Sequence, residues 1–460
     1  MVDFAQRRVV VLGLGDTGLS MARWLARLGA KVQVADTRSD PPHAETLVRE
    51  LPHVALTRGA FREGDLARAE AIAVSPGIDP REPAIANAVK RGVPVVGDIE
   101  LFAQALAERE QRPRVLAVTG SNGKSTVTAM VGAMCREAGI DTVVAGNIGP
   151  PVLDALRGAD DGARAPGVFV LEISSFQLET TTSLEPDAAT MLNLCEDHMD
   201  RYRGLDEYAA AKARIFAGDG VQVLNRDDPW SMRMARAKRH VVSFGAGEPR
   251  AGDEWGITVT DGRRYLAQGA RGVMQAEDLP LAGLHNAMNA LAALALVRAL
   301  DLPEAPLLAA LRAFKGLPHR VQKVTEIEGV TFYDDSKGTN VGATVAALSG
   351  MSCPVVLIAG GDGKGQDFSP LAAPAAARAR AVVLIGRDAP AIAEALRNCG
   401  VPIVRAHDMA EAVRQAHRVS RAGDAVLLSP ACASFDMFRN YVHRGEAFVA
   451  AVRDFEQCGA

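Results

Sequence analysis

A glycine-rich stretch that ends in a lysine and two hydroxyl residues could hold the phosphates of a nucleotide. It covers Thr119–Thr126, reads Thr-Gly-Ser-Asn-Gly-Lys-Ser-Thr and follows the apolar run Val115–Val118. In a phosphate-binding loop, backbone amides surround phosphate oxygens, the lysine supplies a positive charge and a hydroxyl reaches Mg²⁺. Val118 stands where the strict motif has its first glycine, but the place between a predicted strand and a predicted helix favours triphosphate binding. The residues predicted to bind are Gly120, Ser121, Asn122, Gly123, Lys124, Ser125 and Thr126.

Two further segments carry groups that could bind a metal ion near this loop. Glu172 follows the apolar run Val168–Leu171, and the carboxyl ends of parallel strands face the ligand crevice of an open α/β sheet. Its carboxylate suits Mg²⁺, which prefers oxygen ligands. His198 lies among carboxylates in Glu196–Asp200 and could be a metal ligand or a structural residue. Lys212 lies in an alanine-rich predicted helix, where a lysine is ordinarily a solvated residue.

A second glycine-rich turn lies near the N-terminus. Gly13–Gly18 has the form G-x-G-x-x-G, follows the predicted strand Val9–Leu12 and precedes a predicted helix, with Asp36 about twenty residues further on. This fingerprint is typical of a phosphate-bearing ligand and by itself suggests NAD; the alternative is a tight turn that binds nothing. A further turn, Ser75–Gly77, could close over the same ligand.

Polar residues also follow three predicted strands in the last third of the chain. These segments are Asp334–Asn340, Gly360–Gly365 and Ser429–Ser434. Each could be a plain loop, but three of them at strand ends indicate one shared rim of a cleft. The rim would carry Lys337, Lys364 and hydroxyl donors, which suit an anionic small molecule.

Length and periodicity predict three α/β domains. The chain has 460 residues, and at about 150 residues per domain this allows three. Short β-branched runs alternate with helical stretches, a pattern typical of parallel sheets crossed by helices. We expect a Rossmann-like domain at 1–108, a central domain of the P-loop ATPase type at 109–316 and a second Rossmann-like domain at 317–460. The predicted strands are 9–12, 31–34, 71–74, 93–96, 115–118, 168–173, 221–224, 331–333, 355–359, 381–385 and 425–428, the predicted helices are 19–28, 84–90 and 286–298, and an antiparallel excursion is expected at 253–274.

Composition argues against several classes of protein. The net charge of -4 gives no global attraction to nucleic acid or an acidic membrane, and no stretch approaches the roughly 20 apolar residues of a membrane span. The 6 cysteines are scattered without a C-x-x-C pair, unlike a disulfide framework or a zinc site. The N-terminus runs directly into a predicted strand rather than a signal peptide. We expect a cytoplasmic monomer with small-molecule substrates, no nucleic-acid partner and no membrane insertion.

Together these motifs resemble the Mur ligase family over essentially the whole chain. The segments Glu196–Asp200, Asp335–Asn340 and Ser429–Ser434 are most similar to the members that add D-glutamate to UDP-N-acetylmuramoyl-L-alanine. The resemblance implies an ATP-dependent ligase of peptidoglycan precursor synthesis that works through an acyl phosphate. It also implies one domain each for the uridine nucleotide, for ATP and for the incoming amino acid.

The resemblance assigns roles to individual residues of the predicted catalytic centre. It implies that Lys124 binds the β- and γ-phosphates of ATP. Two Mg²⁺ ions are expected, one on Ser125 and Glu172, the other on His198 and a carbamylated Lys212. Carbamylation would turn the lysine ammonium into an anionic oxygen ligand. The remaining ATP contacts are implied at Asn286 and Asn289 for adenine, at Asp335 for ribose, and at Arg320 and Lys337 for phosphate.

The two other substrates have implied sites elsewhere in the chain. D-Glutamate is expected at Thr339, Lys364, Ser434 and the backbone near Tyr441, which replaces a phenylalanine usual in the family. Asp16 replaces an apolar residue, and an acid near the pyrophosphate would be unfavourable. The UDP precursor is expected at Gly15, Asp16, Thr17, Asp36, Thr37, Arg38, Ser75, Gly77 and Asn147.

Three other interpretations stay open at the level of the sequence. A nicotinamide-dependent oxidoreductase would use Gly13–Gly18 and Asp36 but leaves Lys124 unexplained, and NADH fluorescence would detect it. A P-loop regulatory or transport ATPase would turn over ATP without an amino acid. A folate polyglutamate ligase is a related enzyme but gives no reason for the first glycine-rich domain. The chirality of the glutamate is not specified, because both enantiomers carry the same charges.

Overall fold

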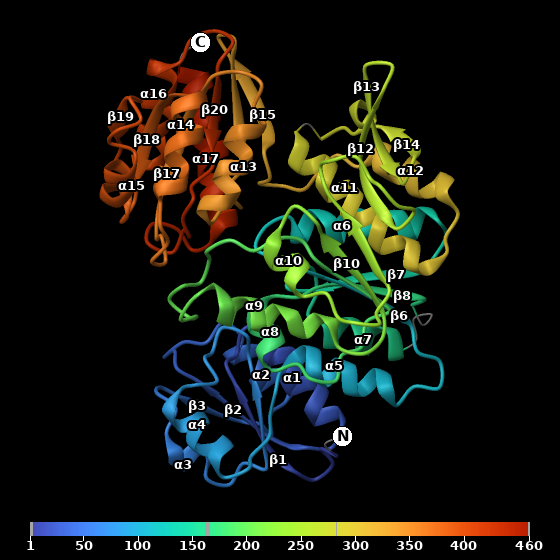
Figure 1. The fold of residues 1–460 in the computed structure, drawn as a ribbon. Helices are drawn as coiled ribbons and strands as arrows, with labels where there is room; N and C mark the ends of the chain where they lie inside the picture. Colours follow the sequence, from blue (N-terminus) through green and yellow to red (C-terminus); the bar gives the residue numbers. More distant parts are fainter. Residues whose placement is uncertain (1–2, 162–165, 282, 459–460) are drawn as a thin grey trace.

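Three sheets follow one another along the chain. The structure is a computed structural model that describes residues 3–161, 166–281 and 283–458. Within these residues the first sheet is 5-stranded, the second 9-stranded and the third 6-stranded. Figure 1 shows the N-terminal part in blue, the central part in green and yellow, and the C-terminal part in orange and red. The predicted α/β class with three domains is confirmed.

The N-terminal sheet is parallel throughout, with the strand order β3-β2-β1-β4-β5. The order reverses between β1 and β4, and a ligand crevice lies outside the carboxyl ends of the strands at such a point. The sequence does not predict β3, because this edge strand has no fully buried residue. The elements are β1 (Arg8–Leu12), α1 (Asp16–Arg27), β2 (Lys31–Asp36), α2 (Ala44–Glu50), β3 (Ala55–Arg58), α3 (Glu63–Leu66), β4 (Ala71–Val74), α4 (Pro83–Lys90), β5 (Val95–Val96) and α5 (Asp98–Ala107).

The central sheet has the order β14-β13-β12-β11-β10-β9-β6-β8-β7. Strand β6 lies between β8 and β9, so the glycine-rich stretch after it begins in the middle of a parallel region. The expected antiparallel excursion is present as β12, β13 and β14. The elements are β6 (Arg114–Thr119), α6 (Lys124–Glu137), β7 (Thr142–Gly146), α7 (Val152–Asp160), β8 (Val168–Glu172), α8 (Ser175–Glu179), β9 (Ala188–Met191), α9 (Leu205–Ala213), η1 (Arg214–Phe216), β10 (Val221–Asn225), α10 (Pro229–Arg233), β11 (Val241–Phe244), β12 (Glu254–Thr260), β13 (Arg263–Gln268), β14 (Arg271–Gln275), η2 (Ala276–Asp278), α11 (Leu284–Val297), η3 (Arg298–Leu300) and α12 (Glu304–Ala313).

The C-terminal sheet has the order β15-β16-β20-β17-β18-β19 and is parallel except for the β15–β16 pair. Because β16, β20 and β17 are neighbours, the three polar loops that follow them start from adjacent strand ends. The elements are β15 (Gln322–Ile327), β16 (Val330–Asp334), α13 (Val341–Gly350), β17 (Val355–Gly360), η4 (Ser369–Leu371), α14 (Ala372–Arg378), β18 (Ala379–Ile385), α15 (Ala389–Ala395), β19 (Ile403–Arg405), α16 (Met409–Val419), β20 (Ala425–Leu428) and α17 (Tyr441–Cys458).

Helix α5 connects the first sheet to the second. Its Phe102 ring packs edge-on against Phe169 of β8, with ring centroids 5.0 Å apart. The carboxylate of Asp98 accepts a 2.9 Å hydrogen bond from Gln177, and that of Glu100 accepts hydrogen bonds from two backbone amides of the loop before β9. One hydrophobic core therefore continues from the N-terminal sheet into the central one.

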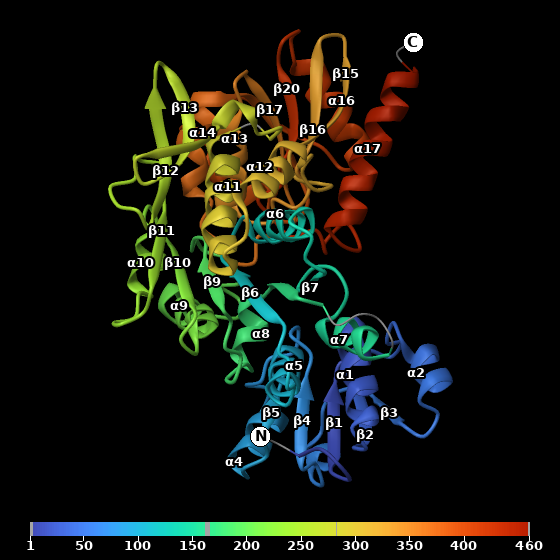
Figure 2. The same ribbon diagram turned by 90° about the vertical axis from the view of Figure 1, so that its right-hand side faces the viewer.

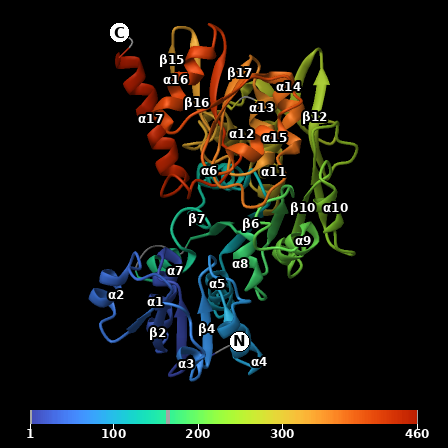
Figure 3. The same cartoon turned by 90° about the vertical axis from the view of Figure 1, so that its left-hand side faces the viewer.

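The central and C-terminal domains meet near the start of α6. Figures 2 and 3 both show the amino end of α17 directed toward this helix. The linker between α12 and β15 also lies here, and its Arg320 donates a 2.9 Å hydrogen bond to the hydroxyl of Ser125 in α6. The strand ends of the third sheet thus face the glycine-rich loop of the second.

Neither a membrane-spanning helix nor a disulfide is found in the described part of the chain. No helix there is both long and apolar enough to cross a bilayer. The cysteines whose side chains are described are all free thiols: Cys135, Cys195, Cys353, Cys399 and Cys432.

Candidate active site

The glycine-rich loop turns from β6 into α6 through two glycines with left-handed or unusual backbone. Gly123 has a φ of 83°, and a Cβ added there would lie 2.6 Å from the side-chain oxygen of Asn289. Gly120 has a φ of 152°, and its added Cβ would lie 3.0 Å from Leu192. Larger residues would therefore be strained at both positions. The chain therefore turns from β6 into the first turn of α6 at these glycines.

Two backbone amides of this loop are already hydrogen-bonded within the protein. The prediction that successive amides hold phosphate therefore applies only to the other amides of the loop. The N–H groups of Ser121 and Asn122 already donate to the backbone and side-chain oxygens of Asn193, each at 2.8 Å. The amides left for an anion are those of the first turn of α6, because a helix has no internal acceptors for them. An anion would therefore sit over the start of the helix, beside Lys124.

Lys124 folds back onto its own loop. Its ammonium donates to the carbonyl oxygens of Gly120 and Ser121, both at 2.9 Å. Burial lowers the pKa of Lys124, and the negative charges of Glu172 and Asp197 oppose that effect. A phosphate would give this ammonium a charged partner in place of two neutral carbonyls.

Glu172 offers an oxygen that the protein itself does not use. The residue is 1 % exposed at the end of β8, and its Oε1 accepts a 2.6 Å hydrogen bond from Asn147. Its buried Oε2 accepts no hydrogen bond from the described chain. A buried carboxylate oxygen without a donor is costly unless a cation or another ligand approaches it. The predicted placement of Mg²⁺ at Glu172 fits this observation.

Lys212 is fully enclosed, unlike the solvated lysine expected from its helix alone. It is 1 % exposed, and its ammonium donates to the carbonyl of Gly120 at 2.9 Å and lies 4.6 Å from the centre of the Tyr208 ring. Burial, reinforced by the charge of Lys124, holds the pKa of Lys212 well below its usual range. The neutral amine is the form that reacts with carbon dioxide, so the site suits the carbamylation implied by the family resemblance.

His198 is held in an unusual backbone conformation beside these groups. Its φ is 59°, and its ring lies 4.7 Å from that of Phe176. Burial lowers the pKa of His198 to about 4, although the nearby carboxylate of Asp197 opposes the shift. The imidazole is therefore neutral at physiological pH and keeps a lone pair for a ligand. Within the described residues, no group of three His, Cys, Asp or Glu side chains is placed to hold a metal ion. The predicted Mg²⁺ ligands therefore depend on Ser125 and a carbamylated Lys212 in addition to Glu172 and His198.

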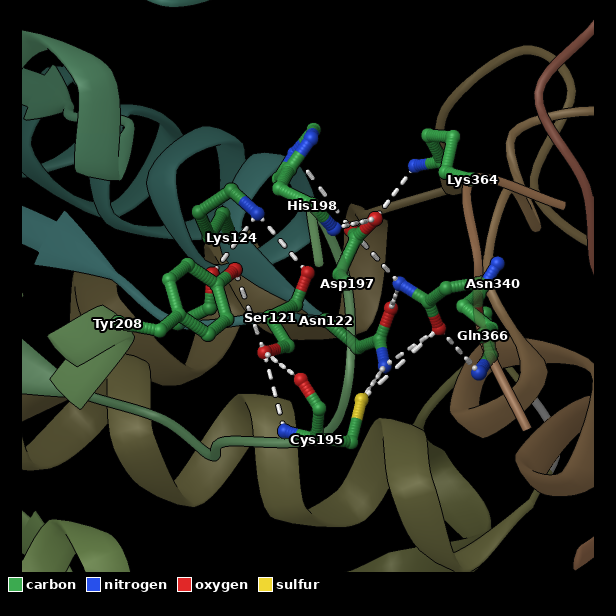
Figure 4. A network of polar contacts seen from close by, with 12 residues as sticks. Ser121, Asn122, Lys124, Cys195, Asp197, His198, Tyr208, Asn340, Lys364 and Gln366 are labelled. Atoms are coloured by element: carbon green, nitrogen blue, oxygen red, sulfur yellow. Dashed lines mark hydrogen bonds and ion pairs between the residues drawn. The ribbon is translucent and has the colours of Figure 1, made fainter. Parts of the chain in front are cut away.

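A polar network connects this centre to the third domain (Figure 4). The ammonium of Lys364 forms an ion pair with Asp197. Asn340 donates to the other oxygen of Asp197 at 3.2 Å and exchanges hydrogen bonds of 3.1 and 3.0 Å with the side chain of Asn122. Lys364, predicted to hold a substrate carboxylate, thus already has a carboxylate partner from the protein.

Three neighbouring cavities contain nearly all the predicted site residues. The middle cavity, of about 620 Å³, joins the loop to the third-domain rim. It shares residues with a cavity of about 420 Å³ on the α11 side and with one of about 540 Å³ at the N-terminal sheet. The predicted residues that line the middle cavity are Gly77, Ser121, Asn122, Gly123, Lys124, Ser125, Asn147, Glu172, His198, Lys212, Arg320, Lys337, Thr339, Lys364, Ser434 and Tyr441.

The cavity on the α11 side contains two titratable groups of the third domain whose pKa values are shifted by burial. Burial raises the pKa of Asp335 to about 7 and lowers that of Lys337 to about 8. The ammonium of Lys337 also lies 3.8 Å from the centre of the Tyr441 ring. The predicted ATP residues that line this cavity are Asn122, Gly123, Thr126, Asn286, Asn289, Arg320, Asp335 and Lys337. Gly120 lines neither this cavity nor the middle one; its carbonyl accepts hydrogen bonds from Lys124 and Lys212 instead.

The third cavity lies at the switch point of the N-terminal sheet. The carboxylate of Asp36 accepts hydrogen bonds from the side chain and amide of Arg38 and from the amide of Leu14. Burial would raise the pKa of Asp36, but these donors outweigh it and lower the pKa to about 2. All nine residues predicted to bind the UDP precursor line this cavity: Gly15, Asp16, Thr17, Asp36, Thr37, Arg38, Ser75, Gly77 and Asn147.

Sequence reasoning assigned no role to Asp197 or Arg444, although the structure buries both and gives each several polar contacts. Asp197 lies in a motif that was recognised, but nothing in its spacing predicts contact with Lys364. Arg444 of α17 has a signal that could have been read: it shares a four-residue spacing with Phe448 and Val452, which are fully buried. A charged residue on the buried face of a helix indicates a specific role.

Comparison with known proteins gives family matches along most of the chain. The Mur ligase MurD-like N-terminal domain matches residues 7–97, the Mur ligase middle domain matches residues 118–297, and the Mur ligase glutamate ligase domain matches residues 319–432. The chain belongs to the Mur ligase family.

Relatives within the Mur ligase family are similar over almost the full length. UDP-N-acetylmuramoylalanine–D-glutamate ligase of Nitrosospira multiformis is 58% identical over 99% of this chain and 97% of its own. The enzyme of the same name from Thiobacillus denitrificans is 60% identical, with 98% and 97% covered. The solved structure of UDP-N-acetylmuramate-alanine ligase from Thermotoga maritima has a TM-score of 0.60 at 18% identity, covering 98% of this chain and 100% of that one. That structure supports the three-domain Mur ligase fold alone.

Proposed function

We propose that this Mur ligase joins D-glutamate to UDP-N-acetylmuramoyl-L-alanine at the expense of ATP, in peptidoglycan precursor synthesis. The observation that carries the proposal is the middle cavity: Lys124 and Glu172 line it, and it shares residues with both other cavities, in a chain 58% identical to a relative that carries this name. The nicotinamide-dependent oxidoreductase is not favoured, because it explains neither this junction nor the third-domain rim.

The UDP part of the precursor is assigned to the cavity of the N-terminal sheet. Asp36 forms an ion pair with Arg38, and both side chains line this cavity. Gly77 and Asn147 line both this cavity and the middle one, so a long substrate can extend from one to the other. Its acyl end would then reach the region of Glu172.

ATP is assigned to the cavity on the α11 side, with its phosphates over the start of α6. Lys124, Arg320 and Lys337 would supply positive charge there, and Asp335, which lines this cavity, is assigned to the ribose. Mg²⁺ would be held by Ser125 and Glu172, with a second ion at His198 and carbamylated Lys212, and would act as a Lewis acid on the phosphate oxygens.

The chemistry requires an anion to attack an anion. The precursor carboxylate attacks the γ-phosphorus, so a carbon–oxygen–phosphorus link forms while the bond from the γ-phosphorus to the bridging oxygen breaks and ADP leaves. Lys124 and the amides of α6 offset the repulsion between these groups. The amine of D-glutamate then attacks the acyl carbon, a proton is lost, and inorganic phosphate leaves as the carbon–nitrogen bond forms.

D-Glutamate is assigned to the third-domain rim of the middle cavity. Thr339, Lys364 and Ser434 line it together with the start of α17 at Tyr441. Because Lys364 is paired with Asp197, a substrate carboxylate has to compete with that side chain for the ammonium. Enclosure between two domains would also keep water from the acyl phosphate.

The test is phosphate release by the purified chain with ATP, Mg²⁺ and the UDP-linked alanyl precursor. A panel of amino acids that includes D- and L-glutamate is supplied one at a time. Turnover that requires both the precursor and D-glutamate supports the proposal. Turnover without an amino acid would indicate a P-loop ATPase, and preference for a folate substrate would indicate the polyglutamate ligase.

We further propose that the enzyme is a cytoplasmic monomer. The residues assigned to all three substrates belong to one chain and line adjoining cavities, so a second copy is not needed to complete the site. Sedimentation at micromolar concentration would check the oligomeric state.

A further inference from the structure

Arg444 in α17 is a buried charge that the proposed mechanism does not use. It is 1 % exposed and is among the largest fully buried side chains. In the described structure its hydrogen bonds go to backbone and hydroxyl oxygens, without a carboxylate among the acceptors. Burial lowers the pKa of Arg444 to about 10, so the guanidinium stays protonated at neutral pH. The charges of Asp334, Asp335 and Asp436 oppose that shift, but none of these carboxylates accepts a hydrogen bond from Arg444. A buried guanidinium held by neutral oxygens is costly, which indicates a specific role.

The guanidinium joins two of the polar loops at the rim of the middle cavity. Its Nη2 and Nε donate to the backbone carbonyl and the hydroxyl of Ser336, at 2.8 and 3.0 Å. Its Nη1 donates to the carbonyls of Cys432 and Ala433, at 3.0 and 3.2 Å. The hydroxyl of Ser336 in turn donates to the carbonyl of Tyr441 at 2.7 Å. Arg444 therefore fixes the loop after β16, the loop after β20 and the start of its own helix to one another.

These bonds determine where the next amide points. In a trans peptide the C=O of one residue and the N–H of the next point in opposite directions. Because the carbonyl of Ala433 points to Arg444 and to the amide of Asp362, the N–H of Ser434 points away from them. No acceptor for that N–H is found in the described chain, and Ser434 lines the middle cavity.

The charge of Arg444 also matters because one of the two lysines of this rim already has a carboxylate partner. Lys364 is paired with Asp197, whereas Arg444 has only neutral acceptors. Glutamate carries two carboxylates and one ammonium, so its pocket needs more positive potential than Lys364 supplies. The guanidinium of Arg444 adds to the potential from behind the loop backbone, together with the ammonium of Lys337 in the cavity wall.

We propose that Arg444 is a positioning residue for the amino-acid substrate, holding the loops at Ser336 and Ala433 so that the amide of Ser434 faces a carboxylate of D-glutamate. The inference rests on the proposed function. It predicts that a substitution at Arg444 raises KM for D-glutamate far more than KM for ATP or for the UDP-linked precursor.

The experiment measures kcat and the KM of each substrate for Arg444→Lys and Ser336→Ala, with the melting temperature recorded for both. Lysine keeps the positive charge but cannot make the forked set of bonds, so KM for D-glutamate should rise about tenfold or more. Ser336→Ala removes only the hydroxyl between Arg444 and Tyr441, so the rise should be smaller, about threefold. KM for ATP and for the precursor should change by less than about twofold.

Arg453→Lys is the matched control, because Arg453 is exposed on the same helix and should leave every constant unchanged. The inference is overturned if Arg444→Lys folds with an unchanged KM for D-glutamate, or if KM for ATP rises equally. Should that variant fail to fold, an unchanged KM for D-glutamate in Ser336→Ala overturns it instead. A wild-type enzyme that ignores D-glutamate would reject the proposed function itself, a result distinct from these.

Discussion

At the scale of single residues, burial changes what ordinary side chains can do. Lys212 and His198 would be a charged lysine and a half-protonated histidine in water. Their enclosure lowers the pKa of each, so both are available in the neutral form that carbamylation or metal binding needs. Burial affects Glu172 in another way, because one oxygen of its buried carboxylate accepts no hydrogen bond from the described chain. These three environments, rather than residue type, distinguish a catalytic centre from a set of polar surface groups.

Lys124→Ala tests the phosphate assignment. Loss of the ammonium assigned to the β- and γ-phosphates within the glycine-rich loop should lower kcat/KM by about 10³-fold, on the order of 4 kcal/mol of transition-state stabilisation. Lys238→Ala, at an exposed position, is the control. Steady-state phosphate release measures both, and near-normal activity of Lys124→Ala would remove the loop from the mechanism.

Asp16 is the departure from the family pattern that most needs an explanation. Its carboxylate lines the UDP cavity and forms a 2.7 Å pair with the ring of His43. We expect the hydrogen bond with His43 to weaken the repulsion between this acid and the pyrophosphate. His43→Ala should therefore raise KM for the UDP precursor, by about threefold for an exposed pair, and Asp16→Leu in the same chain should restore it. Equal KM values in the single and double variants would show that the pair has no part in binding.

At the scale of elements, periodicity identifies buried strands but not edge strands or contacts between helices. The runs that become β1, β6, β8 and β17 are apolar throughout and were predictable. Strand β3 is half-exposed, and the sequence around it carries no alternating pattern. The contact of α5 with the central sheet depends on Phe102 and Asp98, whose partners are far away in the chain. We propose domain boundaries after residues 108 and 316, just beyond α5 and α12.

Asp98 gives a prediction for the junction made by α5. Burial raises the pKa of Asp98 to about 6, partly offset by the hydrogen bond from Gln177. The folded state therefore binds a proton more tightly than the unfolded state, and stability falls as pH rises from about 4 to about 6. Asp98→Asn removes that charge while it can still accept from Gln177. Thermal melts should show Asp98→Asn more stable relative to the wild type at pH 8 than at pH 4; the same difference at both values would contradict the assignment.

At the scale of the whole molecule, the site exists only because two domains meet. Asp197 of the central domain and Lys364 of the third lie far apart in the sequence but form an ion pair. Asn340 adds bonds to Asp197 and Asn122 across the same junction. The contact between the two domains is therefore stabilised by groups that also line the middle cavity. Substrate binding and domain closure should depend on one another for this reason.

Asn340→Ala should loosen the junction. The change removes the bonds to Asn122 and Asp197 and leaves buried groups without partners, so the open form becomes more populated. Small-angle scattering of the ligand-free protein should give a larger radius of gyration than for the wild type. Asn398→Ala, at an exposed position of the third domain, should leave it unchanged. A radius of gyration identical in all three proteins would mean that Asn340 does not hold the domains together.

The sequence by itself determined the α/β class, the three-domain order and the loops that carry chemistry, because these depend on local periodicity and on residues adjacent in the chain. Only the tertiary structure decided which loops meet, which amides of the glycine-rich loop are already used by Asn193, and that the buried Arg444 donates only to neutral oxygens. Those outcomes depend on contacts between segments separated by long stretches of chain, and on burial, which sets both the pKa of a side chain and the need for each polar atom to find a partner.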